Sequence, residues 1–165
     1  MNTLNIEIKE QTLNQSIPKK MKRKATAIWK GSGKDGSGTL SSPSGFFDKS
    51  PYSFKTRFEN EDGTKGTNPE EMIAAAHAGC FNMALSFQIA EVDLEAEELN
   101  TTATVSLEKG DAGFSITGIV LNLTGKVPGM DEKQFTELAN AAKEGCPISQ
   151  ALSSVPISLN ITFNA

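Results

Sequence analysis

The sequence holds few of the residues from which metal and acid-base sites are built. Its 165 residues include one histidine, two cysteines, one tryptophan and one tyrosine. Structural zinc sites use four ligands, usually cysteines and histidines and often from C-x-x-C pairs, and no such pair is present. The glycine-rich segment 31–38 does not match the spacing of a phosphate-binding loop and predicts a turn instead. We therefore expect neither a metal nor a cofactor.

Positive charge and long apolar runs are also scarce. The net charge of -4 and the isoelectric point near 5.1 oppose the positive field that nucleic-acid binding requires. No stretch approaches the roughly 20 consecutive apolar residues of a membrane span, and no apolar segment follows basic residues at the N-terminus. We expect a cytoplasmic protein with neither nucleic acid nor membrane as a partner. In that reducing compartment, catalysis, redox sensing or plain burial would explain the cysteines better than a permanent disulfide.

The chain is predicted to hold one domain over residues 21–165, preceded by a polar N-terminal extension over residues 1–20. Alternation of apolar and polar residues predicts strands near 25–29, 39–42, 52–58, 103–107, 114–123 and 157–163. In the third of these strands Arg57 points away from the aromatic face. The inward face of the fifth strand switches near Gly118, which predicts a β-bulge at that glycine.

Three helices are predicted from their caps. Asn68 and Pro69 begin the first, which is apolar or small on nearly every side from Met72 to Ala90 and should be enclosed by other structure. Asp131 begins the second, which stops at Gly145, and Pro147 begins a short third helix. The order of elements predicts an α+β fold with antiparallel sheets packed around the first helix.

The two cysteines are the candidate reactive groups. Cys80 lies on the predicted buried helix, where a thiol taken alone is more often inert packing. Cys146 precedes the short third helix, a position that lowers the pKa of a thiol. If the two meet in space, a peroxidatic and resolving pair is the economical explanation.

His77 suggests two other functions for the same helix, a zinc site and a Cys-His hydrolase. His77 and Cys80 are three residues apart and could share one zinc ion, although carboxylates would have to complete the site. His77 could also act as the base of a Cys-His hydrolase, although residues three apart on one helix seldom give the required geometry. Packing of His77 against small residues beside the pocket is the favoured interpretation.

Four segments resemble the OsmC branch of the OsmC/Ohr hydroperoxide reductases: YSFKTRF at 52–58, GTNPEEMIAAAHAGCFNMALS at 66–86, DAGFSITGI at 111–119 and GCPISQAL at 145–152. The resemblance runs from Met21 to the end of the chain. It implies an OsmC-like fold in an intertwined homodimer. It also implies that Cys80 is the peroxidatic nucleophile and Cys146 the resolving thiol, while Arg57 steadies the thiolate and Glu70 orients Arg57.

The resemblance further implies a hydroperoxide substrate and an external dithiol reductant, of the lipoyl type on the Ohr side of the family. The apolar residues Phe81, Met83 and Phe87 are expected to favour organic hydroperoxides over hydrogen peroxide. Glu70 precedes Cys80 by ten residues, about 15 Å along a helix. Either the helix breaks, or Arg57 spans the gap, or Glu70 and Arg57 of one subunit reach Cys80 of another. The small residues of the helix favour the third alternative. The competing hypothesis is a redox-sensing or small-molecule-binding protein that uses the same fold without turnover.

Overall fold

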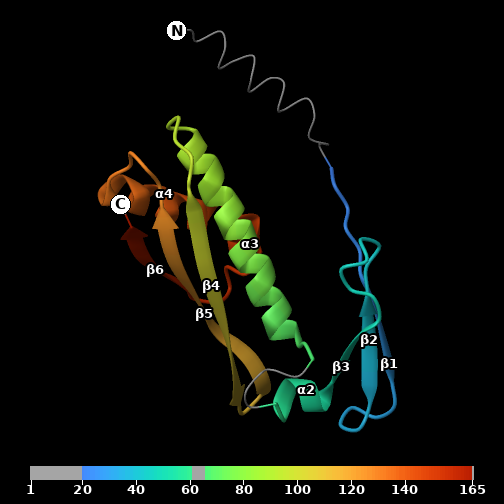
Figure 1. The fold of residues 1–165 in the computed structure, drawn as a ribbon. Helices are drawn as coiled ribbons and strands as arrows, with labels where there is room; N and C mark the ends of the chain where they lie inside the picture. Colours follow the sequence, from blue (N-terminus) through green and yellow to red (C-terminus); the bar gives the residue numbers. More distant parts are fainter. Residues whose placement is uncertain (1–19, 61–65, 165) are drawn as a thin grey trace. The chain divides into compact units, whose positions relative to one another are not determined.

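The computed structural model describes residues 20–60 and 66–164. Its contacts divide the chain into an N-terminal unit, Met1–Phe54, and a C-terminal unit, Lys55–Ala165 (Figure 1). The predicted extension 1–20 lies outside the described residues except for Lys20. The prediction of one domain over 21–165 stays a prediction.

The N-terminal unit contains an antiparallel sheet of three strands in the order β1–β2–β3. The strands are β1 (Thr26–Lys30), β2 (Ser37–Ser41) and β3 (Ser50–Ser53). Thr26 pairs with Ser41 and Lys30 with Ser37, so the predicted hairpin around the glycine-rich turn is confirmed. Every residue of β1 is exposed within the chain, Ile28 and Trp29 among them.

The strand predicted over residues 52–58 is wrong beyond Ser53. β3 ends there, and α2 (Phe54–Phe58) follows as a short helix. Ser53 pairs with Ser37, the first residue of β2, so the chain beyond Ser53 has no further β2 residue to pair with. A helical turn satisfies the backbone internally at that point. Arg57 therefore lies on a helix rather than on a strand.

The C-terminal unit contains a second three-stranded sheet in the order β4–β5–β6. The strands are β4 (Glu98–Gly110), β5 (Gly113–Lys126) and β6 (Ile157–Asn164). β4 and β5 form a long antiparallel hairpin, but β6 runs parallel to β5. The expectation of antiparallel sheets is thus wrong for this pair, because the helices between β5 and β6 form a crossover that returns the chain in the same direction.

The predicted β-bulge is present beside Gly118. Ser106 pairs with Gly118 and Leu107 with Ile116, so Thr117 is the additional residue on β5. The bulge turns the side chains of β5 by one position, and the odd-numbered residues beyond it face the helices. Ile119, Leu121 and Leu123 are accordingly buried.

The helices of this unit are α3 (Pro69–Ala90), α4 (Glu132–Gly145) and α5 (Pro147–Ala151). Both predicted caps are formed, because Asn68 accepts the backbone N–H of Glu71 and Asp131 accepts that of Gln134. α3 and α4 pack against the sheet and against each other (Figure 1). The buried apolar core comprises Phe81, Leu85, Ile89, Ile119, Leu121, Leu123, Val127, Met130, Phe135, Ala139, Ala142 and Cys146.

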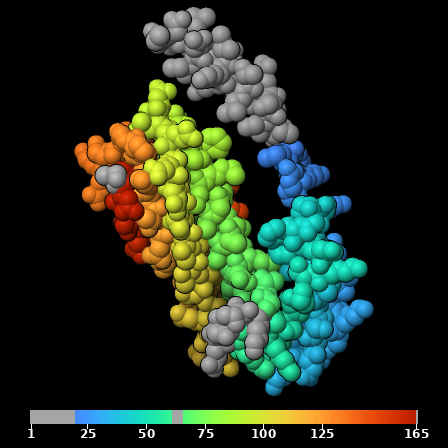
Figure 2. Space-filling model, in the orientation of Figure 1, coloured from blue at the N-terminus to red at the C-terminus, as the bar shows by residue number. Residues whose placement is uncertain are grey.

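Only one side of α3 is buried within the chain, so the prediction of a helix enclosed on nearly every side is not met by a single chain. The buried side is a stripe spaced at i, i+4: His77, Phe81, Leu85 and Ile89. A second stripe is exposed and consists of apolar or small residues: Ala76, Gly79, Met83, Phe87 and Ala90. Atoms of α3 reach the surface in Figure 2.

Two hydrogen bonds from one side chain fix α3 to the neighbouring strand. The amide nitrogen of Asn82 donates to the carbonyl oxygen of Leu99, and the amide oxygen of Asn82 accepts from the hydroxyl of Thr101. Among the described residues, α3 is also the one helix long and apolar enough to cross a membrane by length and composition. This is a weak indication, since the core helix of a globular protein meets the same test.

Replacement of Gly125 should test how closely α4 packs on the sheet. A Cβ atom at Gly125 would overlap the ring of Phe135, which is fully buried. We expect Gly125→Ala to lower the free energy of unfolding by about 1–3 kcal/mol, as overpacking does, measured by urea denaturation at fixed protein concentration. Gly118→Ala on the same strand is the matched control, because its Cβ would meet only ordinary contact with Pro156. Equal losses in both variants would contradict close packing at Gly125.

Candidate functional site

The two cysteines meet inside the C-terminal unit. The sulfur of Cys146 lies 3.0 Å from the sulfur of Cys80, within hydrogen-bonding distance, and both are free thiols. α3 carries Cys80, which is partly exposed, whereas Cys146 is fully buried at the N-cap of α5. The sequence analysis expected a peroxidatic and resolving pair only if the two cysteines meet in space, and they do. Their redox roles stay a prediction.

The two thiols differ in their electrostatic surroundings. Burial raises the pKa of the Cys80 thiol, and its contact with Cys146 raises it further. Burial also acts to raise the pKa of Cys146, but the contacts of its sulfur with Cys80, with the backbone and hydroxyl of Ser149 and with the backbone of Ile148 outweigh burial and lower it. These contacts favour the thiolate of Cys146, whereas burial disfavours that of Cys80, and a nearby positive charge would lower the pKa of Cys80.

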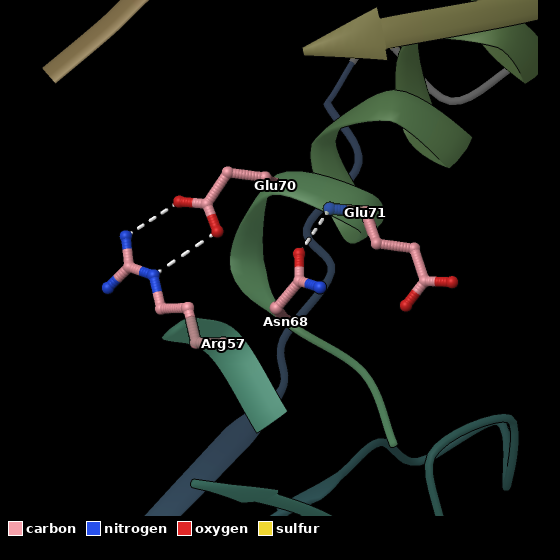
Figure 3. A network of polar contacts seen from close by, with 4 residues as sticks. All are labelled: Arg57, Asn68, Glu70 and Glu71. Atoms are coloured by element: carbon pink, nitrogen blue, oxygen red, sulfur yellow. Dashed lines mark hydrogen bonds and ion pairs between the residues drawn. The ribbon is translucent and has the colours of Figure 1, made fainter. Parts of the chain in front are cut away.

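Arg57 and Glu70 form a bidentate ion pair. Arg57 Nη2 lies 2.6 Å from Glu70 Oε1, and Arg57 Nε donates to Glu70 Oε2 at 3.2 Å (Figure 3). The adjacent Asn68 cap holds the first turn of α3 in place through the backbone N–H of Glu71. Such a pair fixes the plane of the guanidinium and leaves its remaining N–H groups available for another anion.

The ion pair and the thiol pair are separate within one chain. Glu70 lies in the first turn of α3 and Cys80 ten residues later, a rise of about 15 Å. No cation of the described residues contributes to the pKa of Cys80. The structure thus brings together Cys80 with Cys146 and Arg57 with Glu70, but not the two pairs with each other.

A buried polar contact beside the thiols was not foreseen. His77 Nε2 lies 2.8 Å from the hydroxyl oxygen of Ser149, and both side chains are buried. Burial lowers the pKa of His77 and so favours the neutral ring. The position of Ser149 three residues after Cys146, at a helix start, was the one signal in the sequence that could have found it. Among the residues described, no group of three or more potential metal ligands is found.

Aromatic rings lie beside the ion pair. The guanidinium carbon of Arg57 is 4.9 Å from the centre of the Phe58 ring, and that ring lies 4.8 Å from Phe114, which is half exposed. The apolar residues expected around Cys80 are placed differently from the prediction. Phe81 belongs to the core, because the i, i+4 stripe of α3 directs it at the sheet, and only Met83 and Phe87 are exposed.

Comparison with known proteins identifies the family of the chain. The family model described as OsmC-like protein matches residues 61–160. The chain is 50% identical to Peroxiredoxin OsmC of Escherichia coli (strain K12) over 132 residues, which cover 80% of this chain and 90% of that protein. The chain belongs to the OsmC family. The family resemblance predicted from the four motifs is therefore confirmed.

Solved structures of OsmC-family proteins share the fold. The crystal structure of the organic hydroperoxide resistance protein OhrB of Bacillus subtilis matches with a TM-score of 0.65 at 30% identity and covers 84% of this chain and 98% of OhrB. An OsmC-like protein from Mycoplasma pneumoniae matches with a TM-score of 0.69 at 20% identity, covering 88% and 99% of the two chains. The α+β class predicted from the sequence is confirmed.

Mild oxidation should link the two thiols. Because the sulfur atoms are 3.0 Å apart, we expect one equivalent of diamide to convert both cysteines to a disulfide within the chain. Peptide mapping without reductant should find the peptide of Cys80 joined to that of Cys146, with both thiols lost to alkylation. Cys146→Ser is the control and should form no bond within the chain. Persistence of two free thiols in the oxidised wild type would contradict the observed proximity.

Proposed function

We propose that this OsmC-family chain reduces organic hydroperoxides, and hydrogen peroxide less well, through Cys80 and Cys146, and that it serves in antioxidant and stress defence. The observation that carries the proposal is the 3.0 Å approach of the two free thiols, one of them partly exposed. A peroxidatic thiol must reach its substrate, whereas a resolving thiol must only reach the oxidised sulfur. The partly exposed Cys80 and the buried Cys146 fit these two demands.

The peroxidase class follows from the relatives. The names Peroxiredoxin OsmC and organic hydroperoxide resistance protein belong to proteins that match most of the chain or its fold. The chain is a peroxidase-type enzyme with a peroxide-detoxifying role. The substrate preference, the steps and the residues that carry them are our proposal.

The proposed cycle has three steps. The Cys80 thiolate attacks the distal oxygen of ROOH, the O–O bond breaks, and RO⁻ takes a proton and leaves as ROH. The sulfur of Cys146 then attacks the sulfenic acid of Cys80, an S–S bond forms, and hydroxide takes a proton and leaves as water. An external dithiol, which we propose to be of the lipoyl type, exchanges with the disulfide and restores both thiols while it is oxidised itself. A reducing cytoplasm would supply that dithiol.

We propose that Arg57 activates Cys80 across a subunit boundary, with Glu70 holding the guanidinium in orientation. The pKa of Cys80 is raised, and no cation among the described residues of its own chain contributes to it. A nearby guanidinium would lower that pKa. The exposed apolar stripe of α3 and the exposed side chain of Ile28 on β1 support an intertwined homodimer, because a second chain could cover this apolar surface.

The aromatic pair beside Arg57 supports an organic substrate. Phe58 and Phe114 place apolar surface next to the guanidinium that would steady the peroxide. An organic hydroperoxide could rest its alkyl or aryl part there, and hydrogen peroxide has no such part.

Peroxide consumption with excess dithiol tests the proposed chemistry. We expect the wild type to consume cumene hydroperoxide faster than hydrogen peroxide. Cys80→Ser should lose turnover entirely, because the nucleophile is absent, and Cys146→Ser should turn over briefly and then become over-oxidised. Activity that survives Cys80→Ser, or an absence of turnover with every dithiol, would favour a redox sensor or a binding protein over an enzyme.

Mixed dimers test the shared site. Cys80→Ser and Arg57→Ala subunits should each be inactive or nearly so, but a mixed dimer would hold one site with an intact Cys80 and an intact Arg57 from the other subunit. We expect denaturation and co-refolding of the two variants in equal amounts to restore part of the wild-type rate. Failure to restore any activity, despite mixed dimers on native mass spectrometry, would place Arg57 and Cys80 in the same chain.

Charge on the exposed stripe of α3 provides the control for subunit contact. Met83 is 63% exposed in the single chain, yet the dimer would cover it, so Met83→Glu should shift the protein toward monomer in sedimentation experiments and prevent restoration in the mixture. Ala141→Glu on α4 is the matched variant, since Ala141 is also an exposed helical residue. Ala141→Glu should change neither the sedimenting mass of the dimer nor the activity restored in the mixture of Cys80→Ser and Arg57→Ala subunits.

A further inference from the structure

Ser149 and His77 extend the thiol pair into a buried polar chain. His77 Nε2 is 2.8 Å from the Ser149 hydroxyl, and the sulfur of Cys146 is 3.0 Å from that of Cys80. Ser149 is the third residue after Cys146, and hydrogen bonding by its side chain acts to lower the pKa of Cys146. α3 carries His77 and Cys80, whereas α5 and its cap carry Ser149 and Cys146. Four side chains from two elements therefore form one continuous line of contacts inside the C-terminal unit.

The chemistry of the four groups fixes the direction of the hydrogen bonds when Cys146 is a thiolate. A thiolate only accepts, so the Ser149 hydroxyl donates to sulfur and its oxygen is left to accept from His77. The neutral ring of His77 must then carry its one hydrogen on Nε2. His77 Nδ1 is buried and without a hydrogen-bond partner, which suits this tautomer, because Nδ1 is then an unpaired acceptor rather than an unpaired N–H.

We propose that Ser149 and His77 are positioning residues for the resolving step, which hold the Cys146 sulfur as an acceptor facing Cys80. The proposal rests on the proposed function and adds to it the groups that control disulfide formation. Ser149 supplies the hydrogen bond to sulfur, and His77 orients the serine hydroxyl so that its hydrogen points at sulfur and not at the ring.

The balance of the resolving step explains why such a hydrogen bond is useful. Cys146 must lose its proton before its sulfur attacks Cys80, and the departing hydroxide must gain one to leave as water. A hydrogen bond from Ser149 stabilises the thiolate before attack without supplying that proton itself. Because Cys146 is fully buried, water does not provide the same stabilisation.

No charged group among the described residues lowers the pKa of Cys146, so the hydrogen bond from Ser149 becomes important. α3 and α4 pack against α5, and from α3 the titratable groups that face the thiolate are Cys80 directly and His77 through Ser149. Among the described residues, no amine, guanidinium or carboxylate of α4 or α5 contributes to the pKa of Cys146. Hydrogen bonds, and not a neighbouring cation, therefore favour the thiolate.

Titration of Cys146 as the single thiol tests the roles of Ser149 and His77 without any peroxide. In a Cys80→Ser background, the ultraviolet absorbance of the thiolate is followed against pH. We expect Ser149→Ala to move the titration upward by about 1–2 pH units, the effect of losing one hydrogen bond to a charged group. Ser149→Thr keeps the hydroxyl and should titrate near the parent.

Two substitutions at His77 separate orientation from packing. His77→Gln retains an N–H that can donate to Ser149, whereas His77→Phe fills the space without a donor. We expect His77→Phe to raise the pKa of Cys146 and His77→Gln to raise it less. Equal titration of Ser149→Ala, Ser149→Thr and the parent would overturn the role of Ser149. Equal titration of the two His77 variants would overturn that of His77.

A single-turnover experiment tests whether Ser149 acts in the resolving step. With both cysteines present and one equivalent of cumene hydroperoxide, Ser149→Ala should slow disulfide formation about 10- to 100-fold, as a pKa shift of about 1–2 units implies, and slow sulfenic acid formation far less. More sulfenic acid should then be trapped by dimedone than in the wild type. If wild-type Cys80 forms no sulfenic acid, the proposed function fails, whereas equal slowing of both steps in Ser149→Ala overturns only the positioning role.

Discussion

The packing of one stripe of α3 against the sheet is the contact on which the rest of the C-terminal unit depends. Phe81, Leu85 and Ile89 belong to the same apolar core as the buried residues of β5, and His77 continues the stripe toward α5. Because the stripe fixes the rotation of α3 about its axis, it also fixes where Cys80 points. The approach of the two sulfurs follows from this packing and from the place of α5 after α4.

Much of this arrangement can be predicted from the residues themselves. The caps at Asn68 and Asp131, the hairpin around the glycine-rich turn and the bulge beside Gly118 are local signals, and each is formed as expected. The short helix α2 could not be distinguished from a strand, because Phe54 and Phe58 share a face at a spacing of four in either structure. The segment forms a helix because β2 offers no residue to pair with beyond Ser53, and this depends on strand pairing rather than on the local sequence.

The site was predictable in its residues but not in its distances. Cys80, Cys146, Arg57 and Glu70 were named from motifs, whereas their division into two separate pairs depends on the straight, 22-residue course of α3. Ser149 was missed because a serine at the start of a helix is usually explained by capping. Its contact with a histidine 72 residues away becomes visible only in the folded chain.

The two hydrogen bonds of Asn82 have a mechanical consequence for oxidation. They attach α3 to β4 close to Cys80, so α3 cannot slide along the sheet without breaking them. Disulfide formation requires the sulfurs to close from 3.0 Å to about 2 Å. We expect the displacement to fall on the five-residue helix α5. The proposed oxidation would then alter the short segment that joins α4 to β6, while the sheet and its principal helix stay in register.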